Sequence, residues 1–326
     1  MSPIFAGIGI RFPTIAGRRG IIIVLGVLVV LLVGAVVWFV IGSAGGSTVR
    51  VKSTAQLHSY FLDRGYTMQA LRAGNARVPP VFITSVPDEW AKDLDVEQKK
   101  SVFFRTLLPL VLQVNQDIRV DRMRLTELRE RLAGGASPET RDQEWLFNLA
   151  ASYGVVDRDE TDAHTPLSAA QLETLNDRVD IVPPSLALAQ GAIESAYALS
   201  RFAVEGNALF GQWRYGKGLK PEEQREALGD YRIASFKTPF DSVRSYAQNL
   251  NSNPAYKVFR QLRSDARKGG NLPRGLTLVQ GLISYSERGG AYVDEVRALI
   301  KFNRLAPTDT ARLVDAPPIE LRADLF

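Results

Sequence analysis

The sequence predicts a mainly α-helical protein with a small β lobe, preceded by one transmembrane helix. Three observations support this fold class. Residues 21–41 form an unbroken apolar run, several later stretches place apolar residues at helical spacing, and residues 214–239 hold charges, glycines and only short apolar alternation. The chain has 326 residues, of which 45% are hydrophobic, so it is long enough for one large or two modest domains with a full core.

The apolar run predicts a membrane anchor. It reads IIIVLGVLVVLLVGAVVWFVI and contains no charged residue. At about 1.5 Å of rise per residue, a helix of this length spans the hydrocarbon core of a bilayer. Three arginines precede the run (Arg11, Arg18 and Arg19), and no acidic residue occurs before residue 50. This charge bias predicts a cytoplasmic leader at residues 1–20, a periplasmic location for the remainder, and a single-pass protein of the inner membrane.

A cleaved secretory signal peptide is the alternative for the same segment. The small residues Ser43, Ala44 and Gly45 would suit a cleavage site. However, the apolar run is longer than the core of a typical signal peptide, and the arginine-bearing leader before it is extended. These features favour an anchor that is retained.

The charge balance does not indicate a polyanionic partner. The formal net charge is +5, but three of the 40 basic residues are the arginines of the leader, so 37 remain against 35 acidic residues. Nucleic acid is therefore not expected as a partner. The chain has no cysteine, which removes both disulfides and thiol chemistry.

The chain after the apolar run divides into segments that differ in composition and in hydrophobic pattern. Helices are expected from Thr54, from Ser168 with Gln171 as a capping box, and after the Pro183-Pro184 pair, while Glu97–Leu132 predicts either two helices or one long helix kinked at Pro109. The expected organisation is a leader at 1–20, a transmembrane helix at 21–41, a Gly/Ser linker at 42–53, a helical N-terminal extension at 54–166 packed on a catalytic domain at 167–306, and a C-terminal tail at 307–326.

Glu194 is the strongest candidate for a chemical role. It lies late in a strongly apolar helix and is followed by a Gly/Asn turn and an aromatic run. An isolated glutamate is usually a solvated surface residue. Here Ile193 and Tyr197 belong to the buried face, so Glu194 lies at the edge of that face. Half-burial raises the pKa of a carboxyl group and suits it to donate a proton near neutral pH.

The segment Ala189–Trp213 resembles the glucosaminidase family of lysozyme-like cell-wall hydrolases. Its sequence AQGAIESAYALSRFAVEGNALFGQW matches the pattern A-Q-x-x-x-E-S-x-x-G-x-S-x-F…G-N-N-L-F-G at most fixed positions. Ala198 stands where this pattern has Gly, and Tyr197 stands at an unspecified position where the family usually has Trp. The segments VDIVPPSLALAQ, SFKTPFDSVRSYAQNLNSNPAY and LISYSERGGAYVDEV look like the membrane-anchored branch of this family known as Bax proteins. The resemblance then covers most of the chain after the apolar run.

The resemblance implies a lysozyme-like helical domain with Glu194 as the general acid. Residues expected to bind substrate are Gln190, Ser195, Asn207, Phe210, Gln212 and Trp213. Amide and aromatic side chains suit N-acetyl sugars, because amides hydrogen-bond the acetamido group and rings cover the apolar faces of sugars.

The partner of Glu194 is open between two sets of residues. One set is the acidic residues of the predicted β lobe: Glu222, Glu223, Glu226 and Asp230. The other lies in SYSERGGAY, where Glu287 would be a second acid and Tyr285 or Tyr292 would orient the substrate. The loop acids form no motif, so we favour Glu287 with a nearby tyrosine. Arg288 is alternatively a simple ion-pair partner of Glu287.

Other hydrolase chemistries lack the residues they need. The only histidines are His58 and His164, which are too far apart in the sequence for the usual zinc motif. Without cysteine there is no thiol nucleophile, and the sequence has neither a G-x-S-x-G motif nor a phosphate-binding loop. Carboxylate chemistry without a metal or cofactor remains.

The expected function is hydrolysis of β-1,4 bonds in N-acetylglucosamine-containing glycan, with peptidoglycan as the substrate. The expected partners are this glycan and the membrane. Two alternatives stay open: a non-catalytic cell-wall-binding or scaffold module, motivated by Tyr197 and Ala198 and by the missing second acid, and an amidase acting on peptidoglycan.

Overall fold

The computed structural model describes residues 46–323 except 88, 93, 216–217 and 221–230. The chain divides into two compact units, Met1–Gly46 and Ser47–Phe326, and the helices and strands of the described residues belong to the second. The predicted leader and transmembrane helix at 1–41 lie outside the described residues. Among the residues that are described, no helix combines the length and the apolar character that crossing a bilayer requires.

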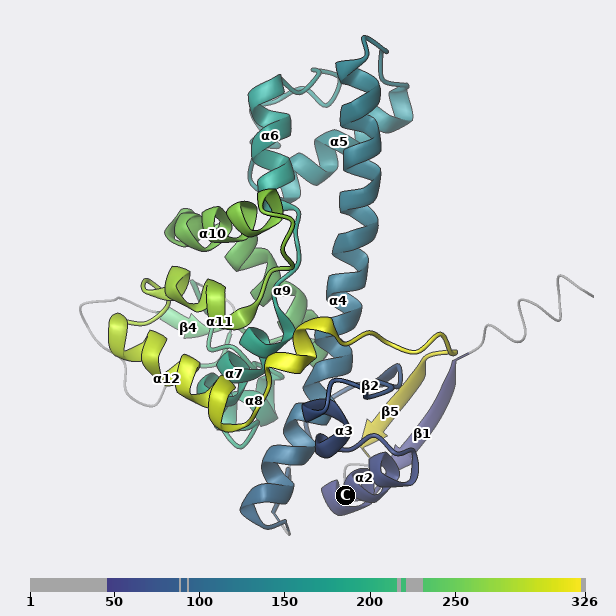
Figure 1. Ribbon diagram of the computed structural model, residues 1–326, viewed down its shortest axis with the longest axis vertical. Coiled ribbons are helices and arrows are strands. Elements are labelled where there is room, and N and C mark those ends of the chain that lie inside the picture. The colour runs from purple at the N-terminus through teal and green to yellow at the C-terminus, as the bar shows by residue number, and fades with distance from the viewer. Residues whose placement is uncertain (1–45, 88, 93, 216–217, 221–230, 324–326) are drawn as a thin grey trace, which may run out of the picture. The chain divides into compact units, whose positions relative to one another are not determined.

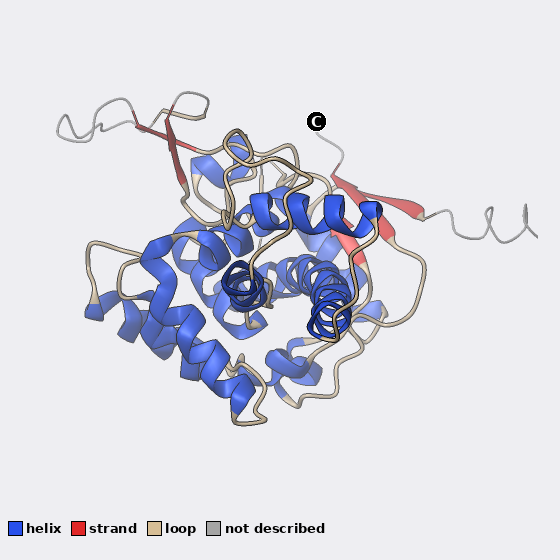
Figure 2. Cartoon of the chain, turned by 90° about the horizontal axis from the view of Figure 1, so that it is seen from above, coloured by secondary structure: helices blue, strands red, loops and turns tan. Residues whose placement is uncertain are grey.

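The prediction of a mainly helical protein is confirmed (Figures 1 and 2). The α-helices are α2 (Thr54–Asp63), α3 (Met68–Arg72), α4 (Val96–Ala133), α5 (Thr140–Ser152), α6 (Ala169–Arg178), α7 (Pro184–Ser195), α8 (Arg201–Gly206), α9 (Pro239–Ser252), α10 (Lys257–Lys268), α11 (Gly275–Leu278) and α12 (Gly290–Phe302). Short 3₁₀ helices are η2 (Pro254–Tyr256), η3 (Val279–Leu282) and η4 (Ala306–Thr310). The strands are β1 (Ser47–Val51), β2 (Val81–Ile83), β3 (Trp213–Tyr215), β4 (Tyr231–Ile233) and β5 (Ile319–Ala323).

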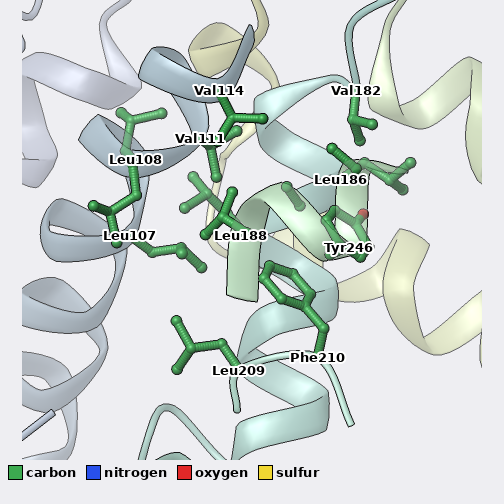
Figure 3. Close-up of a cluster of buried hydrophobic side chains, with 14 of the residues drawn as sticks. Leu107, Leu108, Val111, Val114, Val182, Leu186, Leu188, Leu209, Phe210 and Tyr246 are labelled. Carbon is green, nitrogen blue, oxygen red and sulfur yellow. The ribbon is translucent and has the colours of Figure 1, made fainter. Parts of the chain in front are cut away.

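Helix α4 is one continuous helix that contains Pro109, so of the two alternatives the single long helix is observed. Asp95 and Gln98 form a capping box at its start. Between residues 102 and 118 most of its side chains are buried, because α4 packs against α7 and α9 there. Figure 3 shows this core, where leucines and valines of α4 meet the apolar face of α7 together with Phe210 and Tyr246.

The expected linker at 42–53 and tail at 307–326 each contribute a strand, β1 and β5. β1 and β2 pair in parallel with β5 on either side, in the order β1-β5-β2, with Val49 opposite Leu321 and Val81 opposite Ile319. The alternation of Val49 and Val51 with polar residues is a strand pattern within a segment whose glycines and serines indicated a tether. Val51 and Leu321 are buried, so this sheet belongs to the core of the unit.

The small β lobe lies where the sequence predicts it. Strands β3 and β4 pair antiparallel. Ile233, at the end of β4, also exchanges two backbone hydrogen bonds of 2.8 and 2.9 Å with Leu219. Residues 207–212 join α8 to this hairpin, and Gly211 within them lies beside Glu194 at the end of α7.

Buried polar groups hold the chain where it enters α7. Arg263 of α10 is 1% exposed and donates to the carbonyl oxygens of Asp180 (3.0 Å) and Ile181 (2.9 Å) and to Oδ1 of Asn251 (2.7 Å). At the first turn of α7, the carboxylate of Asp309 accepts from the backbone N–H groups of Ser185 and Gly275, both at 2.9 Å. Because an anion at a helix N-terminus satisfies otherwise unpaired N–H groups, Asp309 fixes the start of the helix that carries Glu194.

Candidate active site

Helix α7 ends one residue after Glu194, in a left-handed turn of three non-glycine residues. Ala196, Tyr197 and Ala198 have φ of 51°, 60° and 64°. Two side chains hold this turn: Ser195 Oγ donates to the carbonyl of Gly191 (2.6 Å) and accepts from the N–H of Ala198 (2.8 Å), and Trp90 Nε1 donates to the carbonyl of Tyr197 (2.8 Å). The turn directs the chain away and leaves Glu194 at the open end of the helix.

Glu194 lines a cleft of about 760 Å³. Four segments meet around this cleft: the end of α7, residues 210–212, the junction of α9 with η2, and residues 284–288 before α12. The lining residues are Glu194, Phe210, Gly211, Gln212, Asn249, Asn253, Tyr256, Ser284, Tyr285, Ser286, Glu287 and Arg288. The cleft therefore presents amides, hydroxyls, aromatic rings and two carboxylates to a ligand.

The environment of Glu194 favours a protonated carboxyl group. Burial raises the pKa of Glu194, and this effect is partly offset by a hydrogen bond from Tyr292 and by the charge of Arg288. The hydroxyl of Tyr292 donates to Glu194 Oε1 at 2.8 Å. Arg288 forms an ion pair with Glu295 (2.7 Å) and lies over the ring of Tyr292. The same carboxyl group is thus desolvated and provided with groups that stabilise its anion.

The second oxygen of Glu194 faces Gly211. A Cβ atom at this position would lie 3.1 Å from Glu194 Oε2, and the φ of Gly211 is +56°. Both the space and the backbone conformation therefore require glycine. Its absence of a side chain keeps Oε2 open on the side of the cleft.

A buried chain of hydrogen bonds lies behind Glu194. The hydroxyl of Tyr246 donates to Gln190 Oε1 (2.7 Å), and Gln190 Nε2 donates to the hydroxyl of Tyr292 (2.9 Å). The amide of Gln190 sets the direction of the chain, because its oxygen only accepts and its nitrogen only donates. The opposite amide orientation would leave the Tyr246 hydroxyl without an acceptor among the described residues. The hydroxyl hydrogen of Tyr292 is consequently directed at Glu194.

Aromatic rings form the wall around this chain. Phe210 stacks on Tyr246 with centroids 3.9 Å apart, and Tyr285 stacks on Tyr292 at 5.5 Å. The hydroxyl of Tyr285 donates to the carbonyl of Phe210 (3.1 Å), which joins the two stacks. Tyr256 packs against Tyr285 and lines the cleft.

Three expected substrate-binding residues make their polar contacts within the protein. Gln190 is fully buried with both polar atoms used in the chain of hydrogen bonds, and Ser195 is fully buried in the turn after α7. Asn207 accepts from the N–H of Val86 (3.0 Å) and donates to the carbonyl of Phe236 (3.1 Å). Their polar groups are already satisfied within the protein, so they are not presented to a ligand.

Phe210 and Gln212 line the cleft as expected. The Oε1 atom of Gln212 is buried and has no hydrogen-bond partner among the described residues. A buried acceptor without a donor is unfavourable, so this atom is suited to accept from a ligand N–H or O–H group. The backbone of Trp213 begins β3, and its side chain lies outside the description.

The structure brings the SYSERGGAY residues to the acid. Glu287 and Tyr285 line the cleft with Glu194, and Tyr292 contacts Glu194 directly. The four acidic residues of the alternative set (Glu222, Glu223, Glu226 and Asp230) lie outside the described residues. The choice between the two sets stays a prediction.

Several cleft residues were not among the predicted ones. They are Tyr246 behind the acid, and Asn249, Asn253, Tyr256, Ser284 and Ser286 in the lining. The first four follow one another at spacings of three, four and three residues in YAQNLNSNPAY. This spacing resembles that of a helical face, although α9 ends at Ser252, so only Tyr246 and Asn249 lie on that helix and Tyr256 lies in η2.

Comparison with known proteins gives three similarities. The family model described as "Glucosaminidase: Mannosyl-glycoprotein endo-beta-N-acetylglucosaminidase" matches residues 169–304. The protein bax of Escherichia coli (strain K12) is 30% identical over 206 residues, which are 63% of this chain and 70% of that protein. The catalytic domain of the autolysin Auto from Listeria monocytogenes aligns with 16% identity and a TM-score of 0.31 over 56% of this chain and 96% of that one, a likeness too weak to support an argument.

Proposed function

Because the chain belongs to the glucosaminidase family, we propose that it is a glycoside hydrolase that cleaves β-1,4 bonds of N-acetylglucosamine-containing glycan, with peptidoglycan as its substrate. Glu194 is the proposed general acid. The observation that carries the proposal is its position: a carboxyl group whose pKa is raised by burial, hydrogen-bonded by Tyr292 at 2.8 Å, in the wall of a cleft of about 760 Å³. An acid in such a cleft is suited to protonate the oxygen that leaves the anomeric carbon.

The buried hydrogen bonds favour one oxygen of Glu194 as the proton donor. Oε1 accepts the hydroxyl hydrogen of Tyr292, so the acidic proton is placed on Oε2, which faces the cleft beside Gly211. When this proton passes to the glycosidic oxygen, the bond from that oxygen to the anomeric carbon breaks and Glu194 becomes a carboxylate. Tyr292 and the charge of Arg288 stabilise the new negative charge.

Glu287 is the proposed partner of Glu194. Glu287 lines the same cleft, and its carboxylate can act as a base, in contrast to the side chains of Tyr285 and Tyr292. The hydroxyls of Tyr285 and Tyr292 already donate to the Phe210 carbonyl and to Glu194. Glu287 would either activate a water molecule that attacks the anomeric carbon or orient the acetamido group of the substrate for that attack.

The remaining lining suits recognition of an N-acetyl sugar. Asn249 and Asn253 form part of the wall and bond each other, from Asn253 Nδ2 to Asn249 Oδ1 at 3.2 Å. Gln212 offers an unpaired carbonyl oxygen to the acetamido N–H. Tyr256 supplies a ring for the apolar face of the sugar. The apolar run at 21–41 is proposed to anchor the protein in the inner membrane with this cleft in the periplasm.

Hydrolysis of purified peptidoglycan tests the proposal. The wild-type protein should lower the turbidity of a wall suspension and release fragments with new reducing ends, whereas Glu194→Gln should bind the wall without releasing them. Fragments that carry free peptide amines and no new reducing ends would indicate an amidase. Binding without any release by the wild-type protein would indicate the scaffold module.

Variants of the acidic residues test the choice of partner. Glu287→Gln should reduce release sharply, while alanine at all four loop acids (Glu222, Glu223, Glu226 and Asp230) should leave appreciable activity. The reverse result would assign the second carboxylate to the β lobe.

A further inference from the structure

A second cleft, of about 600 Å³, lies between α4, α10 and η4. It shares no lining residue with the cleft of Glu194. Four guanidinium groups meet in it: Arg119 and Arg122 from α4, Arg267 from α10, and Arg312 after η4. Nothing in the proposed hydrolysis uses this concentration of positive charge.

Two of the four arginines are already engaged within the protein. Arg267 makes a bidentate contact with the carboxylate of Asp180, from Nε to Oδ2 at 2.9 Å and from Nη2 to Oδ1 at 2.7 Å. Arg122 donates to the carbonyl oxygens of Asn176 (2.6 Å) and Val179 (2.8 Å). These contacts fix one wall of the cleft, and Asp180 neutralises part of its charge.

Arg119 and Arg312 form no hydrogen bond or ion pair within the described part of the chain. Arg119 is partly buried, and its pKa is lowered by this burial and by the charges of Arg312 and Arg267, while the charge of Asp180 offsets part of the effect. A partly desolvated guanidinium beside like charges is unfavourable unless an anion binds to it. Guanidinium groups match carboxylate and phosphate oxygens in geometry, so an oxyanion is the expected counterpart.

Acidic residues of the same cleft restrict the kind of molecule that can carry this oxyanion. Asp309 lines it as well, with its carboxylate already accepting from the backbone N–H groups of Ser185 and Gly275. Glu127 and Glu130 line it further along α4. At 1.5 Å per residue, they lie roughly 12–16 Å along the helix axis from Arg119. A polyanion following the cleft would be repelled by these carboxylates. A ligand with a carboxylate at one end and an ammonium group at the other matches both ends.

The cleft also has an apolar part of its lining. Met123, which lies between Arg119 and Glu127 on α4, is 68% exposed, and Leu272 is 50% exposed. Such surfaces suit the methyl and methylene groups of a small ligand. An extended peptide of about four residues spans roughly 13 Å, which is the distance between the charged ends.

We propose that this cleft binds a short peptide, with its terminal carboxylate at Arg119 and Arg312 and its ammonium group at Glu127 and Glu130. The site does not depend on hydrolysis at Glu194. Arg122 and Arg267 contribute a positive wall, and Met123 and Leu272 contact the aliphatic part of the peptide.

Calorimetric titration of the full chain in detergent with tetra-alanine tests the site. We expect binding that weakens about tenfold or more when the peptide is amidated at its C-terminus, and again when it is acetylated at its N-terminus, because each change removes one charge-assisted contact. Inorganic phosphate serves as the comparison for a simple anion. Phosphate that binds as well as the peptide, or a peptide whose amidation changes nothing, would overturn the proposal, as would a lack of binding by tetra-alanine.

Variants locate the binding within the cleft. Arg312→Gln changes an exposed side chain and should weaken binding about tenfold without altering the melting temperature, and Arg119→Gln should do the same from the partly buried side. Arg244→Gln, an exposed arginine of α9 outside both clefts, is the matched control and should bind normally. Equal affinity in the Arg312→Gln and Arg244→Gln variants would exclude this cleft as the site.

Discussion

Replacing Tyr292 with phenylalanine removes a single oxygen atom from the hydrogen bonds behind Glu194, and its effect depends on pH. In the wild-type protein this hydroxyl donates to Glu194 Oε1 at 2.8 Å and accepts from Gln190 Nε2 at 2.9 Å. The bond to Glu194 lowers the pKa of that carboxyl group against the effect of burial. Without it, the pKa of Glu194 rises further and the acid keeps its proton at higher pH.

The magnitude follows from the kind of bond that is lost. A hydrogen bond to a charged group contributes about 1.5–3 kcal/mol, and one between neutral groups contributes about 0.5–1.5 kcal/mol. The hydroxyl therefore stabilises the carboxylate over the acid by roughly 1–1.5 kcal/mol, which is about a tenfold shift in the ionisation equilibrium. The same energy is lost as the carboxylate forms during proton transfer, so the maximal rate should fall about tenfold.

The pH profile of wall hydrolysis measures both effects. The high-pH limb of the Tyr292→Phe variant should move to higher pH while its maximum decreases. Tyr285→Phe is the matched control, because Tyr285 stacks on Tyr292 but its hydroxyl donates to the carbonyl of Phe210. The high-pH limb of the Tyr285→Phe variant should not shift. The role assigned to the Tyr292 hydroxyl would be refuted if the high-pH limb of the Tyr292→Phe variant did not move. It would also be refuted if the limb of the Tyr285→Phe variant moved by the same amount.

Four further substitutions have defined outcomes. Glu194→Gln should reduce hydrolysis by about a hundredfold to ten-thousandfold. Burial raises the pKa of Glu194 in the folded state, so ionisation of this group destabilises the fold as pH rises. The Glu194→Gln variant should therefore have a higher melting temperature than wild type at pH 8 and the same melting temperature at pH 3. Ala196→Gly should raise the free energy of unfolding by about 0.5–1 kcal/mol in urea titrations, because it removes the strain of a left-handed alanine at an exposed position. Ala198→Gly also removes a buried methyl group, so it should leave the free energy of unfolding nearly unchanged. Arg263→Met should lower the free energy of unfolding by about 3–5 kcal/mol, and an unchanged urea midpoint would contradict the anchoring role of this arginine.

The features that the sequence predicted correctly depend on neighbouring residues. The capping box of Ser168 and Gln171 opens α6 as expected, because its two hydrogen bonds join residues three positions apart. The hairpin after Trp213 and the position of Glu194 at the edge of an apolar helix were likewise visible in short windows of sequence. Each of these structures is determined by a local pattern of charge, hydrophobicity and turn-forming residues.

The features that were missed depend on distant residues. The function of Gln190 is set by Tyr246 and Tyr292, which are 56 and 102 positions away, and an amide in a motif gives no indication of whether it faces a ligand or two tyrosines. The pairing of β1 with β5 joins the two ends of the described unit. No periodicity within either segment specifies that partner, so the Gly/Ser composition suggested a linker.

The departure of Tyr197 and Ala198 from the family pattern illustrates how tertiary contacts replace a local preference. The pattern has glycine at position 198, and glycine adopts a left-handed conformation without strain, whereas Ala198 costs roughly 1–2 kcal/mol there. Tyr197 has the same backbone conformation at a similar cost. The ring of Tyr197 packs edge-on against Phe103 and Phe104 of α4, at 5.5 and 5.8 Å, and its carbonyl accepts from Trp90. All three partners come from residues 54–166. The segment expected to be an extension packed on the catalytic domain therefore holds the turn that places Glu194, and substitutions at Trp90 should affect the geometry of the acid as well as the stability of the fold.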